Sequence, residues 1–158
     1  MQILLANLED PRHQQAIIGL LDMYCRDEFG SGKPLPQATR DKLIEGLKTA
    51  RGICFLAEEQ TSAAPGEFIG LALCLPSFSS FRARPILNVH DLVVAPGHRV
   101  QGVGQALLKG VEEEARRRGC CKVTLEVRED NEVAKAAYLR VGFVPTAPQT
   151  QFWARELG

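Results

Sequence analysis

The residues best suited to bind an anion lie in one turn, between a predicted strand at residues 86–94 and a predicted helix that follows Gly104. The turn contains Gly102 and Gly104, spaced Gly-x-Gly, and Arg99 shortly before them. The first N–H groups of a helix have no partner within the helix, and the positive end of its dipole lies beside them. Because glycine lets an anion approach the backbone closely, the pattern favours a phosphate site to which Arg99 adds a charge. By itself the Gly-x-Gly spacing is a weak signal, and a turn that merely needs glycines also explains it.

Two better-known phosphate loops do not fit this turn. No Gly-Lys-Ser or Gly-Lys-Thr occurs in it, which excludes the nucleotide-binding P-loop. The dinucleotide-binding pattern needs a third Gly or Ala where this chain has Leu107.

A second pair of residues with chemical potential lies further along the chain. Asn131 and Tyr138 are seven positions apart, about two helical turns, so both face one side of a predicted helix at residues 131–141. Each has an ordinary structural explanation. Asn131 is a good N-cap residue, and Tyr138 is a typical core aromatic with its hydroxyl at the edge.

Together the two segments resemble the GNAT superfamily of N-acetyltransferases. Arg99-x-x-Gly102-x-Gly104 is similar to the pyrophosphate loop of that family, and the run from Asn131 through Tyr138 to Gly142-Phe143 is similar to its second signature. The resemblance covers residues 86–145 and implies a single domain over residues 1–158. It implies an α/β fold with a mixed, mostly antiparallel sheet, a central parallel splayed pair of strands, and flanking helices. Val100 departs from the family, because many members carry a glycine there.

The resemblance also implies that acetyl-CoA is the co-substrate. Its pyrophosphate would lie on the turn, and its pantetheine arm would lie beside the strand that ends at Val94. Amides of that arm can pair with a strand edge, and N–H groups there can stabilise an oxyanion. The implied contacts are Leu92, Val93, Val94, Arg99, Val100, Gln101, Gly102, Val103, Gly104, Gln105, Asn131 and Tyr138.

The same resemblance suggests which residues move protons. An alkyl amine with a pKa of about 10.4 is mostly protonated at pH 7, so a base is useful. His90 occupies the usual glutamate position of the family, and it is the first candidate base because imidazole titrates near pH 6.5. An ordinary strand histidine explains it equally well. Asp91, expected on the opposite face, is the second candidate. Tyr138 matches the tyrosine that protonates the departing thiolate.

The acceptor is less clearly indicated. In the family its site includes the connection between the first two helices, where Asp27 and Glu28 could attract a cationic amine or simply end a helix. A small-molecule amine is the expected acceptor, and a protein N-terminus or lysine is the alternative. A non-catalytic acyl-CoA sensor would use the same loop. A homodimer is also expected, with the tail after Gln149 as a candidate interface.

The elements that must position these residues follow from hydrophobic periodicity. Helices are expected around Ile17–Tyr24, around Leu43–Leu47, and after Gly104, where Val103, Leu107, Val111 and Ala115 form one stripe. Strands are expected at residues 53–57, 68–75, 86–94, 122–128 and 143–145, with a last one at 151–155 and a turn at 60–66.

Composition narrows the classes of protein. The 158 residues suit one domain. With 19 basic and 19 acidic residues, the chain lacks the charge of a nucleic-acid binder or of a basic membrane anchor. No apolar run reaches the roughly 18–20 residues of a membrane span, and the N-terminus does not resemble a secretory signal. The five cysteines have no metal-site spacing, so we expect free thiols, no metal, and a cytoplasmic protein.

Overall fold

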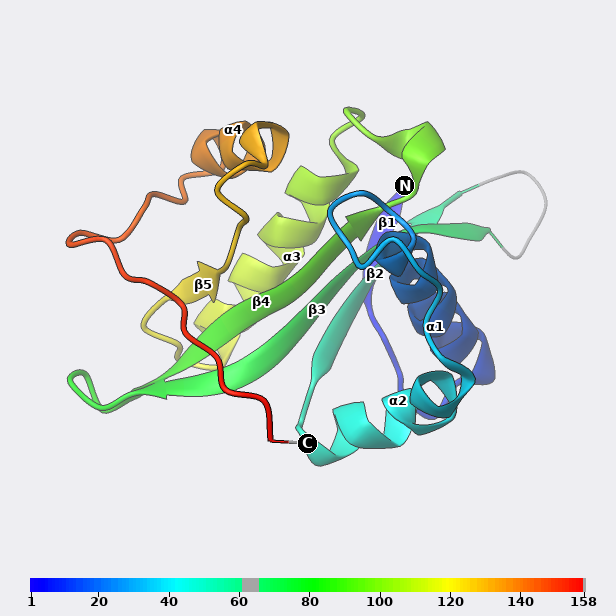
Figure 1. The fold of residues 1–158 in the computed structure, drawn as a ribbon, viewed down its shortest axis with the longest axis horizontal. Coiled ribbons are helices and arrows are strands. Elements are labelled where there is room, and N and C mark those ends of the chain that lie inside the picture. The colour runs from blue at the N-terminus through cyan, green and yellow to red at the C-terminus, as the bar shows by residue number, and fades with distance from the viewer. Residues whose placement is uncertain (61–65, 158) are drawn as a thin grey trace.

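The computed structural model describes residues 1–60 and 66–157, and within them five strands form one sheet in the order β1-β2-β3-β4-β5 (Figure 1). The first four strands are antiparallel to their neighbours, and β5 is parallel to β4. This confirms the predicted mixed, mostly antiparallel sheet. The elements are β1 Gln2–Leu5, α1 Pro11–Cys25, α2 Gln37–Thr49, β2 Ile53–Glu59, β3 Glu67–Ser79, β4 Arg84–Val94, a short 3₁₀ helix Pro96–His98, α3 Val103–Arg117, β5 Val123–Leu125 and α4 Glu132–Arg140.

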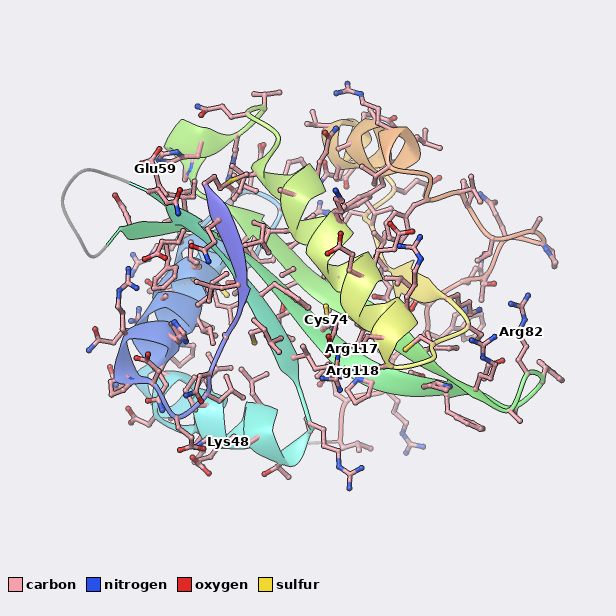
Figure 2. The ribbon with its side chains drawn as sticks, turned by 180° about the vertical axis from the view of Figure 1, so that it is seen from behind. Lys48, Glu59, Cys74, Arg82, Arg117 and Arg118 are labelled. Carbon is pink, nitrogen blue, oxygen red and sulfur yellow. The ribbon has the colours of Figure 1, made fainter. Side chains whose placement is uncertain are left out.

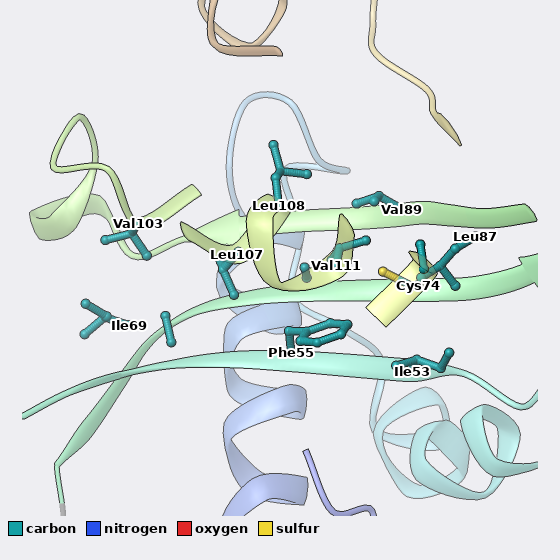
Figure 3. Close-up of a cluster of buried hydrophobic side chains, with 13 residues drawn as sticks. Ile53, Phe55, Ile69, Cys74, Leu87, Val89, Val103, Leu107, Leu108 and Val111 are labelled. Atoms are coloured by element: carbon teal, nitrogen blue, oxygen red, sulfur yellow. The ribbon is translucent and has the colours of Figure 1, made fainter. Parts of the chain in front are cut away.

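Two hydrophobic cores lie on opposite faces of the sheet. On one face α1 and α2 pack through residues such as Ile17 and Leu47 against Leu56, Leu71 and Val93 of the strands. On the other face α3 packs against the remaining strand residues, with Phe55 beneath it (Figure 3). Because strand side chains alternate between faces, the central strands β2 and β3 are apolar on both sides, whereas β4 also carries the polar residues Asn88, His90 and Asp91. The site described below therefore lies on a sheet covered from both faces.

Helix α3 forms as its sequence predicts. Its apolar stripe, Val103, Leu107, Val111 and Ala115, is buried throughout. On the solvent side Glu114 pairs with Arg117 and Arg118 at 2.6 Å, and hydrogen bonds from Arg117 and then Arg118 lower the pKa of Glu114 to about 2. Both arginines lie at the C-terminal end of the helix (Figure 2), where a positive charge also suits the helix dipole. The helix ends before Gly119, whose φ of 71° is the left-handed conformation of a typical C′ glycine.

Gly70 in β3 allows α3 to approach the sheet. A Cβ at Gly70 would lie 2.9 Å from Val103 Cγ1 and 3.0 Å from Leu107 Cδ1, both of them buried. We expect Gly70→Ala to lower the free energy of unfolding by about 1–3 kcal/mol, because the core must shift to admit the methyl group. Gly46→Ala is the control. A Cβ there meets nothing within 4 Å, and alanine in a helix is favoured over glycine by about 1 kcal/mol. Urea titration of both variants measures the difference, and equal stabilities would contradict this packing argument.

Three predicted features differ from the structure. The strand β1 was not expected, because its four residues are too few to show a clear alternation. The strands expected at 143–145 and 151–155 were wrong, since neither segment is extended against a partner and the residues from Val144 to Leu157 are exposed. The strand expected at 122–128 is confined to Val123–Leu125. Of the turn predicted at 60–66, residues 61–65 lie outside the described part of the chain.

The apolar length needed to cross a bilayer is not reached by any helix within residues 1–60 and 66–157.

Candidate active site

The site is centred on a gap between β4 and β5. The two strands pair only where Leu87 to Val89 face Val123 to Leu125, whereas β4 continues to Val94. Since Ala95 donates its N–H to Ile69 of β3, strict alternation directs the N–H and C=O groups of Leu92 and Val94 away from β3. The last part of β4 therefore presents free N–H groups to the gap, as the edge of a sheet does.

A β-bulge at His90 decides which side chains face which side of this gap. Leu73 of β3 pairs with Asp91, but the next residue, Cys74, pairs with Val89, so His90 is an extra residue in β4. Val89 and Leu92 both pack on the α3 face as a result. Asp91 shares the opposite face with Val93, beneath α1, and His90 is exposed.

Asp91 is a half-buried carboxylic acid in a largely apolar setting. Burial raises its pKa above the ordinary value of 3.8, and the nearby His90 offsets this only in part. Within the described residues no hydrogen bond to its carboxyl group occurs. Burial, and then the charge of Asp91, raise the pKa values of Tyr24 and Cys25 at the end of α1. Asp91 is therefore an acid–base group that faces α1 and remains open to solvent.

Tyr138 lies on the other side of the gap. It projects from α4 and packs with Phe143 edge to face, with ring centroids 6.1 Å apart. Burial and then the nearby Tyr24 raise the pKa of its hydroxyl, which therefore keeps its proton at neutral pH. Tyr24 was read from the sequence only as a member of a helix stripe. The structure shows that its charge environment includes the neighbouring Asp27 and also Asp91 and Tyr138, which lie far from it in the chain.

The Gly-x-Gly turn offers several backbone donors. Gly102, with a φ of 83°, is the N-cap residue of α3 and provides no side-chain cap. The first helical hydrogen bond runs from Ala106 to the carbonyl of Gly102, which leaves the first-turn N–H groups free. Val100 also has a positive φ, 60°, which is strained for a β-branched residue and explains why a glycine suits that position. The turn thus has the free donors that the predicted anion site requires.

Arg99 does not point freely from this turn. Its Nη2 donates to Oδ2 of Asp27 at 2.5 Å, and its Nε donates to the Val94 carbonyl at 3.3 Å. The hydrogen bond from Arg99 holds the pKa of Asp27 below its ordinary value. The structure therefore joins a predicted anion-binding residue to a predicted amine-binding residue. Glu28, the other predicted amine-binding residue, is exposed.

The connection between α1 and α2, residues 26–36, extends across the open end of the gap (Figure 1). Asp22 fixes one end of this connection by accepting hydrogen bonds from Leu35 N at 2.8 Å and from Arg40, which lies 2.5 Å away. On the β5 side, the guanidinium of Arg128 lies 5.6 Å from the ring centroid of Phe29. The connection therefore contacts the segments that follow β4 and β5, at Arg99 and at Arg128.

The remaining predicted site residue, Asn131, has the structural role that its sequence position suggests. It is the N-cap of α4, and its Oδ1 accepts a hydrogen bond from Ala134 N at 3.0 Å.

A cavity of about 610 Å³ lies between α3 and the end of α4. Gln105 and Lys109 belong to its lining, but Asp91 and Tyr138 do not. Within the described residues no group of three or more potential metal ligands comes together.

Comparison with known proteins identifies the family. Residues 17–143 match the model of the acetyltransferase (GNAT) family. The chain is 32% identical to the uncharacterised N-acetyltransferase YhfO of Bacillus subtilis over 128 residues, which are 81% of each protein. It is 40% identical to the streptothricin acetyltransferase of Streptomyces lavendulae over 80 residues, which are 51% of this chain but only 40% of that protein.

A solved structure supports the same conclusion. A crystal structure described as that of a probable acetyltransferase covers 100% of this chain and 99% of its own, with a TM-score of 0.85 and 25% sequence identity. The glycine turn at the start of α3 and the segment from Asn131 to Phe143 both lie within the residues that match the family model. The chain therefore belongs to the GNAT family of N-acetyltransferases.

Proposed function

We propose that this protein transfers the acetyl group of acetyl-CoA to a primary amine of a small molecule, by direct attack within a ternary complex. The observation that carries the proposal is the edge of β4, which carries Asp91, presents free N–H groups to the gap and leads into a turn of unpaired N–H groups. A strand edge suits the amides of the pantetheine arm, and the turn suits the pyrophosphate. We also propose that the whole chain, residues 1–158, acts as one domain.

The residues of the gap have complementary roles in this reaction. The amine nitrogen, once neutral, attacks the thioester carbon, and the C–S bond breaks. Asp91 accepts the proton that the amine loses. Burial raises its pKa above that of an exposed carboxylate and so toward neutral pH, which suits a general base. His90 lies beside it at the bulge and is the alternative base. Tyr138 donates its proton to the departing CoA thiolate. Free N–H groups along β4 stabilise the negative charge on the thioester oxygen.

The cofactor contacts proposed from the sequence fit this arrangement. Leu92 and Val94 present backbone groups to the gap, with Val93 between them. The turn provides donors from Val100 to Gln105, and Asn131 begins the helix that carries Tyr138. The five cysteines are free in the structure, which suits a reducing cytoplasm.

A small-molecule acceptor is favoured over a protein. One relative is named for streptothricin, and the local charge near α1 is acidic at Asp27, Glu28 and Asp91. A protein N-terminus or lysine is the second candidate. A non-catalytic acyl-CoA sensor is opposed by the presence of Tyr138 and Asp91 on the two sides of the same gap.

The test combines binding with turnover. Acetyl-CoA at 100 times its Kd is expected to stabilise the fold by about 2.7 kcal/mol, seen as an increase in Tm. CoA thiol release is then measured with a panel of amines that includes a peptide with a free N-terminus. Stabilisation with release on a small amine supports the proposal. Stabilisation without release on any amine would favour the sensor, and no stabilisation would contradict both.

A further inference from the structure

The starting observation is that Arg99 is held by two other groups of the protein. Its guanidinium spans from the Val94 carbonyl, at the edge of the gap, to the carboxylate of Asp27 in the α1–α2 connection. The Asp27 side chain is only 17% exposed, whereas that of Arg99 is 50% exposed. The pair therefore leaves the guanidinium accessible to an incoming anion while its acidic partner is largely enclosed.

The position of Asp27 is fixed by the fold. Asp22 accepts a hydrogen bond from Leu35 N, and Phe29 packs under the Arg128 guanidinium, so the connection is attached on both sides of Asp27. Asp27 Oδ1 also accepts from Phe29 N at 3.4 Å. When Arg99 turns to another anion, Asp27 cannot simply follow it. A carboxylate that is largely enclosed and has lost its counter-charge is costly, and a nearby cation relieves that cost.

We propose that Asp27 competes with the pyrophosphate of CoA for the Arg99 guanidinium, so that binding of CoA releases the Asp27 carboxylate for the cationic acceptor. Asp27 is thus a positioning residue that couples the two halves of the active site. The inference rests on the proposed function, since it takes the turn at Val100–Gln105 to be the pyrophosphate site. Coupling is reciprocal, so a cationic acceptor bound at Asp27 also favours CoA.

The test is a double-mutant cycle on CoA binding in the absence of an acceptor. Isothermal titration with CoA is carried out on the wild-type protein, D27N, R99Q and D27N/R99Q. Asparagine keeps the oxygen that accepts from Phe29 N but removes the charge that competes for Arg99. A partly exposed ion pair is worth up to about 1 kcal/mol, so D27N is expected to bind CoA about fivefold more tightly. This gain should vanish in the R99Q background, because R99Q has no guanidinium for which Asp27 and the pyrophosphate could compete.

Two further variants exclude a general effect of charge or of folding. E113Q removes an equal charge from an exposed side chain of α3 and should leave the affinity for CoA unchanged. D27E restores the charge and should return the affinity toward that of the wild type. Circular dichroism confirms that each variant folds.

The outcomes separate this inference from the proposed function. If the wild type binds CoA and D27N binds it equally well or more weakly, Asp27 supports Arg99 instead of competing with it, and the inference is overturned. A gain that persists in R99Q, or that E113Q reproduces, overturns it too. If the wild type does not bind CoA at all, the proposed function itself fails.

Discussion

Replacing Asp91 with asparagine is expected to lower kcat about 100-fold at pH 7, while the Kd for CoA stays within about twofold of the wild type. Asparagine keeps the shape of the side chain but cannot accept a proton, and general bases contribute about 10²–10⁴-fold. The rate is measured as thiol release with an amine that the wild type accepts. His90→Gln, which alters the neighbouring residue at the bulge, is the comparison and should have a smaller effect.

The pH dependence of kcat/KM tests the same role of Asp91. Burial raises the pKa of Asp91, so its ionised form, the base, is lost as pH falls through a value above the ordinary 3.8. We expect kcat/KM of the wild type to decrease as the pH falls and Asp91 becomes protonated. This acidic limb of the pH profile should be absent in Asp91→Asn. If His90→Gln removes the limb and Asp91→Asn keeps it, His90 is the base, as the family position alone suggested.

Replacing Tyr138 with phenylalanine is expected to lower kcat by about 100-fold and to leave the affinity for CoA unchanged. The phenyl ring keeps the packing on Phe143, so only the hydroxyl is lost. The effect stays at the low end for a general acid, because a thiol with a pKa near 8.5 is already a fair leaving group. Thiol-release assays at several pH values measure the decrease in kcat.

Tyr24→Phe is the informative comparison, because Tyr24 and Tyr138 are the two tyrosines of the chain and the charge of Tyr24 raises the pKa of Tyr138. Equal rates for Tyr138→Phe and the wild type across the pH range would remove Tyr138 from the mechanism. A loss in Tyr24→Phe alone would assign the acid to α1 instead.

The parts of the fold that sequence predicts best are those in which one local pattern repeats. The stripe from Val103 to Ala115 extends over more than three helical turns, and every member is buried. The N-cap at Asn131 and the left-handed glycine at Gly142 also follow from residue type alone. The strand predicted in the tail at 151–155 was wrong, because an alternating pattern indicates only that a segment can form a strand. Whether it becomes one depends on a partner strand, which the pattern does not specify.

The sequence predicts the glycine turn of the candidate site but not the contacts that connect its parts. The turn at Gly102 and Gly104 is local, so spacing reveals it. The bulge at His90 is a property of the pairing between two strands, and it assigns Asp91 to the α1 face without any signal in either strand alone. The Arg99–Asp27 pair joins residues 72 positions apart, and neither residue type indicates the other.

The central claim is that the free N–H groups of the turn and of the β4 edge hold CoA. The most direct test is a titration of the ¹⁵N-labelled protein with CoA, followed by amide NMR. The largest shifts are expected at Val100–Gln105, with smaller ones at Leu92 and Val94. Saturating binding that leaves these amides unmoved, and shifts instead the residues around Lys109 and Gly142 that line the neighbouring cavity, would contradict the account.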